Sequence, residues 1–538
     1  MAYRKSYVTW VLVVLTCLCV ANQWERYLPY HLSKLSIDEC SGECHGVEYT
    51  TICESCSPGD VHCEACRECR IEYEIGDISM RDDLCLSDSQ YSYITGIGFT
   101  FPYCLFLLVF GWAVDRFRHL VVEMLVAAQV GLAVCGAAFC AASTFSGLIA
   151  PRALEGLCLA APFPCILAIL AEIFPRDGRA QAAGVVAAGQ YAGYAGAFAG
   201  LYLTGLIGWR ATALLVAMLV MAVVFALGVT VRAPEMPHLG GLALSLSLAA
   251  DERARRLVNL LLDPVFSSLL MAAVMREMGR SILMNCFSGY YQMKFNAVSS
   301  YGTSDYFTSF NAIATACASV ISCYFGGRFG SLYGKKHPAA LAIVPALGCF
   351  AALPLLIGAV YTTSIISMCM CIWFAYLFGE CWKGCTYAVL QNHLPNDSLG
   401  IASAVFYLFI TIFGEIAEVF VSSFNTFPTE NKGYKSALLW TLGLTYIGAG
   451  LLYILLAKRI HMKTMLGGGQ QQRGPFRAGG TTATEGDNEE PGETTKLLLG
   501  VGGVPATAPR PKKKKKKKSN PTAGVGAGGT LAWSRARS

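Results

Sequence analysis

Charged residues are scarce in this chain of 538 residues, because Asp, Glu, Lys and Arg together make up only 14% of it. Average soluble domains contain about 25%. Hydrophobic residues make up 54% and come in long runs, which is more apolar surface than one water-soluble core could hide. The composition therefore excludes an ordinary soluble domain and predicts a membrane protein.

The sequence also lacks the short motifs of several common catalytic sites. It contains no P-loop, no H-E-x-x-H, and no G-x-S-x-G on a plausible turn. An ATP-driven pump is therefore disfavoured, and catalysis has no support. We expect a protein that is not an enzyme, binds no cofactor or resident metal, and has no nucleic-acid partner.

A cleavage site is missing after the first apolar segment, residues 8–20. Arg4 and Lys5 precede that segment, as they would in a signal peptide, but Gln23 and Trp24 follow it where small residues are needed. We interpret the segment as part of the first membrane span, with its basic end in the cytosol. A cleaved signal peptide is the alternative.

Twelve segments are apolar enough to span a bilayer, which takes about 20 residues of α-helix. They lie at residues 8–34, 91–113, 119–143, 147–173, 181–207, 210–231, 264–294, 305–327, 338–361, 364–391, 400–425 and 434–457. The predicted fold is an all-α membrane protein of twelve transmembrane helices in two six-helix halves, residues 1–231 and 264–457. The linker 232–263 is polar enough for the cytosol and could hold an amphipathic helix. Residues 458–538 are expected to form a disordered cytosolic tail.

Basic residues gather in the loops that fall on one side of the membrane when the spans alternate. They are Arg116, Arg118, His119, Arg176, Arg179, Arg328, Lys335, Lys336, His337, Lys458, Arg459 and Lys463. The positive-inside rule makes this side cytosolic and places both termini there.

The loop between the first two spans, residues 36–90, falls on the opposite side and is rich in cysteine. Its cysteines are Cys40, Cys44, Cys53, Cys56, Cys63, Cys66, Cys69 and Cys85. In an oxidising compartment, eight cysteines in so short a stretch predict four disulfides, whose pairing the sequence leaves open. A zinc site is the alternative, prompted by the C-x-x-C spacings, although the topology favours disulfides. The loop is also acidic, and could be a stapled cap or a binding module.

Two loops carry related strings of glycine and charge at matching places in the two halves. The first string contains Gly111, Asp115, Arg116 and Arg118, and the second contains Gly326, Gly327 and Arg328. The first resembles the G-x-x-x-D-R-x-x-R signature of the major facilitator superfamily, whose parallel six-span repeats fit the predicted spans. The resemblance implies a conformational latch, in which a carboxylate and arginines at helix ends hold neighbouring helices together in one state. Plain positive-inside anchoring is the alternative, and it explains only the basic residues.

Ionisable residues at span depth are costly and are therefore candidates for function. The candidates for transport and proton coupling are Glu25, Arg26, Arg152, Glu155, Glu380 and Glu415. Glu25 and Arg152 enter their spans from the same side and could pair. A carboxylate that alternates between an arginine and a proton would couple protons to transport. The alternative is that Glu25 caps its span at the membrane interface.

Local spacing suggests partners for some of these charges. Arg152 and Glu155 lie one turn apart, as do Glu380 and Lys383, so each couple could form an ion pair. The two glutamates of span 11 have no local partner, so at least one is expected to be protonated or to face water. Other polar groups at span depth could line a cavity or bond neighbouring helices. They are Gln190, Tyr191, Tyr194, Asn285, Tyr290, Tyr291 and Asn311.

Several strings resemble the spinster family of the superfamily. They are Asn22-Gln-Trp-Glu25-Arg26, Arg152-Ala-Leu-Glu-Gly156, Ala171-Glu172-Ile-Phe174, Leu377-Phe-Gly379-Glu380 and Phe413-Gly414-Glu415. The resemblance implies proton-linked export of lysophospholipids, sphingosine-1-phosphate or related lipids, at lysosomes or the cell surface. The sequence departs from the family at Leu159, where an acidic residue is usual and Glu155 could substitute. It also has Glu25 where the family usually has Asp.

The C-terminal tail carries two short signals. Glu493, Leu497 and Leu498 resemble an acidic dileucine signal, which vesicle adaptor proteins read for endosomal and lysosomal sorting. The lysine run 512–518 could hold anionic lipid or be a solvated disordered run.

The sequence as a whole favours a secondary transporter of a small molecule, with a lipid or lysolipid as the expected cargo. Membrane lipids and protons are further expected partners. One alternative is a transport-inactive receptor or scaffold that binds through the Cys-rich loop, and another is a facilitator for a non-lipid organic solute. Charges inside the spans favour transport, because a scaffold has little need of them.

Overall fold

The computed structural model describes residues 5–32, 80–84, 86–231, 250–295, 303–395, 398–426 and 431–471. Every regular element in these ranges is a helix. The chain divides into two units, Met1–Gly474 and Pro475–Ser538, and all described residues belong to the first. The predicted disulfide cysteines, the dileucine signal at Glu493, Leu497 and Leu498, and the lysine run lie outside the described residues.

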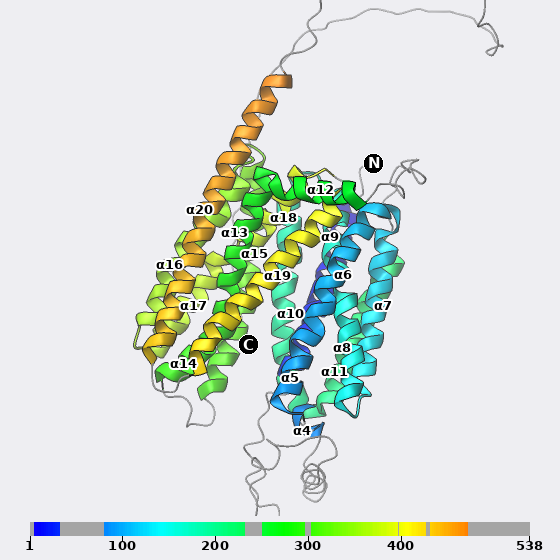
Figure 1. Ribbon diagram of the computed structural model, residues 1–538, viewed down its shortest axis with the longest axis vertical. Helices are drawn as coiled ribbons and strands as arrows, with labels where there is room; N and C mark the ends of the chain where they lie inside the picture. Colours follow the sequence, from blue (N-terminus) through cyan, green and yellow to red (C-terminus); the bar gives the residue numbers. More distant parts are fainter. Residues whose placement is uncertain are drawn as a thin grey trace, which may run out of the picture. The chain divides into compact units, whose positions relative to one another are not determined.

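The predicted spans of the first half are helices that pack together. They are α1 (Lys5–His31), α6 (Ile97–Arg116), α7 (Val121–Cys140), α8 (Phe145–Leu159) with α9 (Pro162–Ile173), α10 (Arg179–Ile207) and α11 (Trp209–Thr230). Two short helices, α4 (Met80–Asp83) and α5 (Asp88–Thr95), precede α6, and a turn at Arg118–Leu120 joins α6 to α7. We call the end of the bundle at that turn the latch end and the opposite end the α4 end (Figure 1).

The predicted spans of the second half are helical as well. They are α13 (Pro264–Ser281) with α14 (Phe287–Phe295), α15 (Thr303–Gly334), α16 (Ala340–Tyr361), α17 (Ile365–Gly379) with α18 (Trp382–His393), α19 (Leu399–Ser422) and α20 (Asn431–Gln471). A π-helical turn at Ile282–Cys286 connects α13 to α14, and α12 (Ala250–Leu262) lies across the latch end (Figure 1). Helix α20 runs beyond the predicted end of its span at 457.

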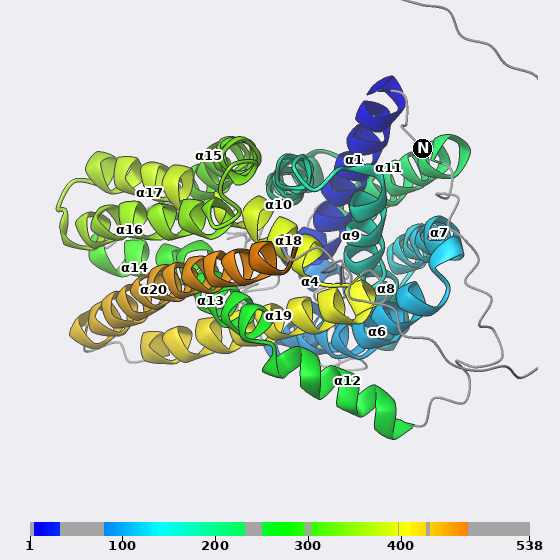
Figure 2. The same ribbon diagram turned by 90° about the horizontal axis from the view of Figure 1, so that it is seen from above.

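Ten helices in the described ranges are long and apolar enough to cross a membrane. The remaining predicted spans, 181–207 and 264–294, are helical but more polar, because α10 is rich in glycine and α13 carries three charged residues. Figure 2 shows the helices as two groups, which meet where α10 packs on α15 and where α6 packs on α19.

Glycines let the two groups touch near the latch end. A Cβ atom on Gly184 of α10 would stand 2.6 Å from the carbonyl oxygen of Cys323 on α15 and 3.1 Å from the Cα of Gly327. A Cβ atom on Gly384 of α18 would stand 2.7 Å from the Cα of Gly184. The backbones of α10, α15 and α18 are therefore in direct contact, and a side chain at position 184 would hold the halves apart.

The fourth span of each half is broken. In the first half α8 ends at Leu159 and α9 begins at Pro162, whose ring nitrogen cannot continue the hydrogen-bond ladder of the preceding helix. In the second half α17 ends at Gly379 and α18 begins at Trp382. Glu380 lies in this second break, so the break positions a charged residue inside the bundle.

Candidate functional site

A cavity of about 240 Å³ lies between the two halves. Helices α1, α5, α6, α8 and α10 form one wall, and α13, the π-helical turn, α18 and α19 form the other. Its charged lining residues are Arg26, Arg152, Glu277, Arg280, Lys383, Glu415 and Glu418. Of the six residues predicted to serve transport and proton coupling, Arg26, Arg152 and Glu415 line this cavity. The other three, Glu25, Glu155 and Glu380, are not among its lining residues.

Arg26 lies among aromatic side chains on the first wall. Its guanidinium carbon is 5.4 Å from the ring centres of Tyr27 and Phe99 and 5.3 Å from that of Tyr103. Cation–π contacts hold a guanidinium while leaving its hydrogen-bond donors available. Glu415 of α19 is 4.0 Å from Nη2 and its side chain is 53% exposed, so the ion pair across the cavity is loose. Arg26 is therefore placed to receive an anionic group.

Arg152 forms a buried ion pair on α8. Its Nη1 lies 2.6 Å from Oε2 of Glu155, which is the predicted spacing of one helical turn. Its Nε donates to the carbonyl oxygen of Ile94 at 3.1 Å, and its Nη2 donates to that of Arg26 at 3.0 Å. The guanidinium carbon also stands 4.5 Å from the ring centre of Phe99. Arg152 thus ties α8 to the backbone of α1 and α5.

Glu25 makes no ion pair with Arg152 among the described contacts, which corrects the predicted pairing. Its carboxylate turns toward α7, where a Cβ atom on Gly136 would stand 2.5 Å from Oε1. The side chain is buried, and Oε2 has no hydrogen-bond partner within the described part of the chain. Helix α1 continues past Glu25 to His31, so Glu25 does not end its helix. The physical reason for the correction is that Glu155 sits on the same helix as Arg152 and occupies the guanidinium.

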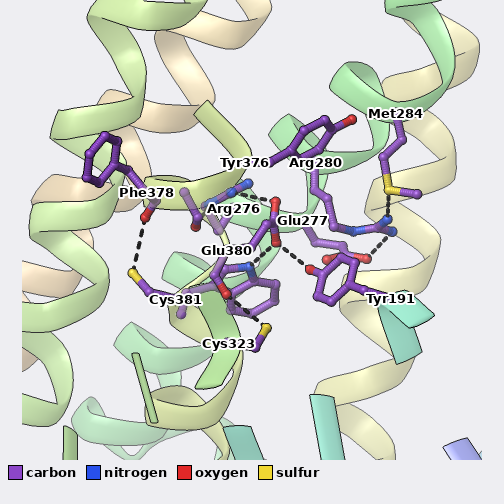
Figure 3. Close-up of polar contacts among 12 residues, drawn as sticks. Tyr191, Arg276, Glu277, Arg280, Met284, Cys323, Tyr376, Phe378, Glu380 and Cys381 are labelled. Carbon is purple, nitrogen blue, oxygen red and sulfur yellow. Dashed lines mark hydrogen bonds and ion pairs between the residues drawn. The ribbon is translucent and has the colours of Figure 1, made fainter. Parts of the chain in front are cut away.

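Glu380 is the centre of a second buried network. Its Oε1 lies 2.7 Å from Nη2 of Arg276, and both side chains are fully buried. Trp382 Nε1 donates to the other carboxylate oxygen at 3.2 Å, and the hydroxyl of Tyr191 donates to it from α10. Figure 3 shows the carboxylate held between Arg276 on one side and Tyr191 on the other. The carboxylate therefore has a donor on each oxygen, and one donor comes from the opposite half.

Lys383 does not form the predicted ion pair with Glu380. Its Nζ donates to Oε1 of Gln190 at 3.3 Å and stands 4.6 Å from the ring centre of Tyr191, both on α10. The reason is the helix break at Glu380, because the spacing rule for neighbouring side chains holds only within a continuous helix. Gln190 and Tyr191 are thus helix-to-helix bonding groups as well as cavity lining.

Three charged residues of α13 were missed by the sequence interpretation. Arg276 pairs with Glu380, and Arg280 Nη2 lies 2.5 Å from Oε1 of Glu277. A signal was available, since Arg276, Glu277 and Arg280 are three charges within a predicted span, and such residues are functional candidates by default.

The two glutamates of span 11, Glu415 and Glu418, contact residues of other helices. Asn285, in the π-helical turn, donates to Oε2 of Glu418 at 2.5 Å. Both Glu415 and Glu418 line the cavity, as expected for residues without a local partner. The π-helical turn adds one residue to the repeat of α13 and places Asn285 against α19; such turns frequently occur at functional sites.

Asp115 fastens the two halves at the latch end. Its Oδ1 accepts the backbone N–H of Gly400 at 2.6 Å and its Oδ2 accepts that of Ile401 at 2.8 Å. These N–H groups belong to the first turn of α19, where the helix dipole favours a negative charge. Gly111 allows the approach, since a Cβ atom there would stand 2.8 Å from the carbonyl oxygen of Gly400.

The matching contact in the second half uses a neutral side chain. Ser331 Oγ accepts the backbone N–H of Gln181, at the beginning of α10, at 2.9 Å. Arg118 pairs with Glu172 of α9 at 3.2 Å, and the guanidinium carbon of Arg116 stands 5.9 Å from the ring centre of Phe117. The exposed Arg328 has no described contact that tests its assignment to the latch.

Arg179, which the sequence interpretation counted only as a basic loop residue, also joins the halves. Its Nη1 donates to the carbonyl oxygen of Gln391 at 2.8 Å and to Oδ1 of Asn392 at 3.0 Å, both at the end of α18. Gln391 in return donates to the carbonyl oxygen of Leu167 at 3.0 Å. Together with Asp115, these bonds hold the latch end closed.

Two groups of membrane-spanning helices around a charged cavity define a membrane transporter rather than an enzyme. The chain belongs to the major facilitator superfamily, whose family model matches residues 75–418. The predicted fold class and superfamily are thereby confirmed.

The fold is also found in solved structures. A bacterial homolog of the human lysosomal transporter Spinster, inward-facing and unoccupied, matches with a TM-score of 0.51 and 18% identity, over 86% of this chain and 99% of that chain. A second structure of a bacterial Spinster homolog, inward-facing and occupied, has a TM-score of 0.46 and 17% identity, over 86% and 98%. At 18% identity the first likeness shows a shared fold. No curated protein matches the chain.

Proposed function

We propose that the protein is a secondary transporter that moves a lipid or lysolipid by alternating access, coupled to protons. The cavity carries this proposal, because it lies between two halves that are fastened at the latch end and it combines charged groups with aromatic rings. An amphipathic substrate needs both kinds of contact. The spinster-like strings around Arg26 and Glu415 favour a lipid, and the basic loops favour a cytosolic latch end.

We assign the coupling proton to Glu25. The buried pair Arg152–Glu155 is already neutral, so a second bare carboxylate at Glu25 would leave an uncompensated charge in the membrane interior. A proton on Glu25 removes that charge. When the proton leaves, the negative carboxylate of Glu25 is attracted to the guanidinium of Arg152. Glu25 then competes with Glu155 for Arg152. Because Arg152 also bonds the backbone of Arg26, this competition moves the cation that faces the cavity.

Glu380 has a different role in this scheme. Its ion pair with Arg276 and its bond from Trp382 lie within one half and compensate its charge, so we assign it to a structural ion pair rather than to proton transfer. The exposed Glu415, by contrast, is free to exchange Arg26 for a cationic group of the substrate. The four disulfides, the organelle and the adaptor-binding signal stay predictions.

Uptake into proteoliposomes with an imposed pH gradient tests the proposal. The wild type should take up a labelled lysophospholipid faster than a sugar or an amino acid, and the gradient should accelerate this uptake. Glu25→Gln should keep the uptake measured without a gradient and lose the acceleration, because an amide releases no proton. Glu123→Gln, at an exposed position of α7, is the matched control and should respond like the wild type.

The outcomes separate the alternatives. Acceleration of Glu25→Gln by the gradient to the wild-type rate would refute the assigned coupling residue. Uptake of sugars or amino acids in preference to lipids would favour a facilitator for non-lipid solutes. A folded protein that transports no tested compound, with or without residues 36–79, would favour the receptor or scaffold.

A further inference from the structure

Part of the apolar surface of helix α12 is not covered by the rest of the protein. Its sequence places charged residues in the first half and Leu257, Val258 and Leu260 to Leu262 in the second. At helical spacing, these apolar residues form a wide band that begins beside Arg255. Leu260 and Leu261 pack against the main hydrophobic core of the bundle. Val258 remains 51% exposed and Leu262 72% exposed, so one edge of the apolar band faces away from the protein.

The position of α12 decides what can cover this edge. A single residue, Asp263, separates α12 from α13, and its Oδ1 caps α13 by accepting the N–H groups of Val265 and Phe266. Arg459 of α20 donates to the carbonyl oxygen of Pro264. The junction is therefore fixed at the latch end of α13 and α20, and α12 lies beside the ends of these two helices.

The direction of α12 carries it to the edge of the bundle. Figure 1 shows α12 running across the latch end rather than along the bundle, and Figure 2 shows it extending outward past α19 and α6. Because the helices of the bundle span a bilayer, we expect a helix at their latch end to lie beside lipid headgroups. An amphipathic helix with exposed apolar residues and a charged face is the kind that lies in the plane of the interface.

Charge selects the kind of lipid. Arg253, Arg255 and Arg256 exceed the two acidic residues of α12 by one positive charge. The end of α20 adds Lys458, Arg459 and Lys463 at the same end of the bundle. Positive charge beside a membrane attracts anionic phospholipid.

We propose that α12 is an interfacial helix that binds the lipid leaflet at the latch end. Val258 and Leu262 insert between the lipids, and the net positive charge of α12 favours anionic headgroups. The leaflet thereby anchors the chain directly before α13, the helix that carries Arg276 and the cavity-lining residues Glu277 and Arg280. This role is separate from substrate transport and does not depend on which substrate the cavity binds.

Photo-crosslinking of the full-length protein in lipid nanodiscs tests the insertion. A photoreactive amino acid replaces Val258 or Leu262 in two samples, and the exposed Asn259 on the polar side of the helix in the control. The expected result is abundant phospholipid adducts at positions 258 and 262 and about tenfold fewer at 259, because an apolar helix face enters the interface and its polar face does not. Equal lipid labelling at the three positions, or adducts to protein instead of lipid at 258 and 262, would overturn the proposal.

A second measurement tests the lipid class. Nanodiscs of phosphatidylcholine mixed with phosphatidylserine should give adducts at position 262 that are enriched in phosphatidylserine. Replacing Arg253, Arg255 and Arg256 by Gln should reduce that enrichment about fivefold or more, since each basic residue near an anionic surface contributes about that factor. An unchanged enrichment, in a variant with wild-type thermal stability, would rule out the arginines as the source of the lipid preference.

Discussion

Replacing Asp115 by Asn should release the latch end. Asp115 accepts two backbone hydrogen bonds from the first turn of α19, at 2.6 Å and 2.8 Å, and each carboxylate oxygen takes one. Asn keeps one acceptor oxygen, and its amide group meets the second N–H with a donor. The variant also loses the negative charge at the helix N-terminus.

The magnitude follows from those two losses. A hydrogen bond to a charged group contributes about 1.5–3 kcal/mol, and a neutral one about 1 kcal/mol. The closed latch should therefore be destabilised by about 2 kcal/mol, which lowers the ratio of closed to open molecules ~30-fold. Ser331→Ala is the matched comparison, because it removes one neutral bond at the equivalent place in the second half. It should lower the ratio only about fivefold.

Single-molecule fluorescence transfer between the two halves measures this ratio. Fluorophores on unnatural amino acids at His119 and Lys335, both exposed at the latch end, avoid labelling the 23 cysteines. The closed state gives high transfer and the open state low transfer. Equal populations in the wild type and Asp115→Asn, or a larger shift for Ser331→Ala, would refute the view that the charged cap holds the latch.

Three further substitutions have distinct expected outcomes. Glu380→Gln leaves Arg276 buried without its counter-charge and should destabilise the protein by about 3–5 kcal/mol, which a lower melting temperature in detergent would show. The double substitution Glu380→Leu with Arg276→Met removes both charges and should recover most of this lost stability. Gly184→Leu should raise the low-transfer population in the fluorescence assay, because its side chain meets the backbone of α15, and Gly443→Leu, with nothing within 4 Å of its Cβ position, should not. Arg26→Lys should weaken substrate affinity about fivefold through the loss of about 1 kcal/mol of aromatic stacking, and an unchanged KM would contradict the assignment of Arg26 to substrate binding.

The sequence is informative wherever the cause is local. A bilayer imposes a length and an apolar composition on each span, so the positions of the helices follow from hydropathy. Arg152 and Glu155 pair as spacing predicts, because α8 is continuous between them. Glu380 and Lys383 have the same spacing and do not pair, because the helix breaks between them. The spacing rule thus works only when the backbone conformation is already known.

Contacts between helices are beyond the reach of local spacing. Arg276 is 104 positions from Glu380, and Asp115 is 285 positions from Gly400. Sequence interpretation found Asp115 through its motif but could not find its partner, which is a pair of backbone N–H groups and carries no side-chain signature. The same limit explains why the position of the Glu25 carboxylate was not predicted. The space that it occupies exists because Gly136, on another helix, has no side chain.

The distribution of strong and weak contacts explains how such a protein can open. The tight buried ion pairs, Arg152–Glu155 and Arg276–Glu380, each lie within one half and keep that half rigid. The pair that crosses the cavity, Arg26–Glu415, is 4.0 Å long and exposed on the Glu415 side, so it contributes about 0–1 kcal/mol. This pair therefore costs little to separate. The bonds of Tyr191 to Glu380 and of Lys383 to Gln190 also join the halves, and together with the bonds of Asp115 and Arg179 at the latch end they set most of the balance between closed and open states. A bound substrate can shift that balance through Arg26 and Glu415 without breaking either buried pair, which is what rigid-body rocking of two halves requires.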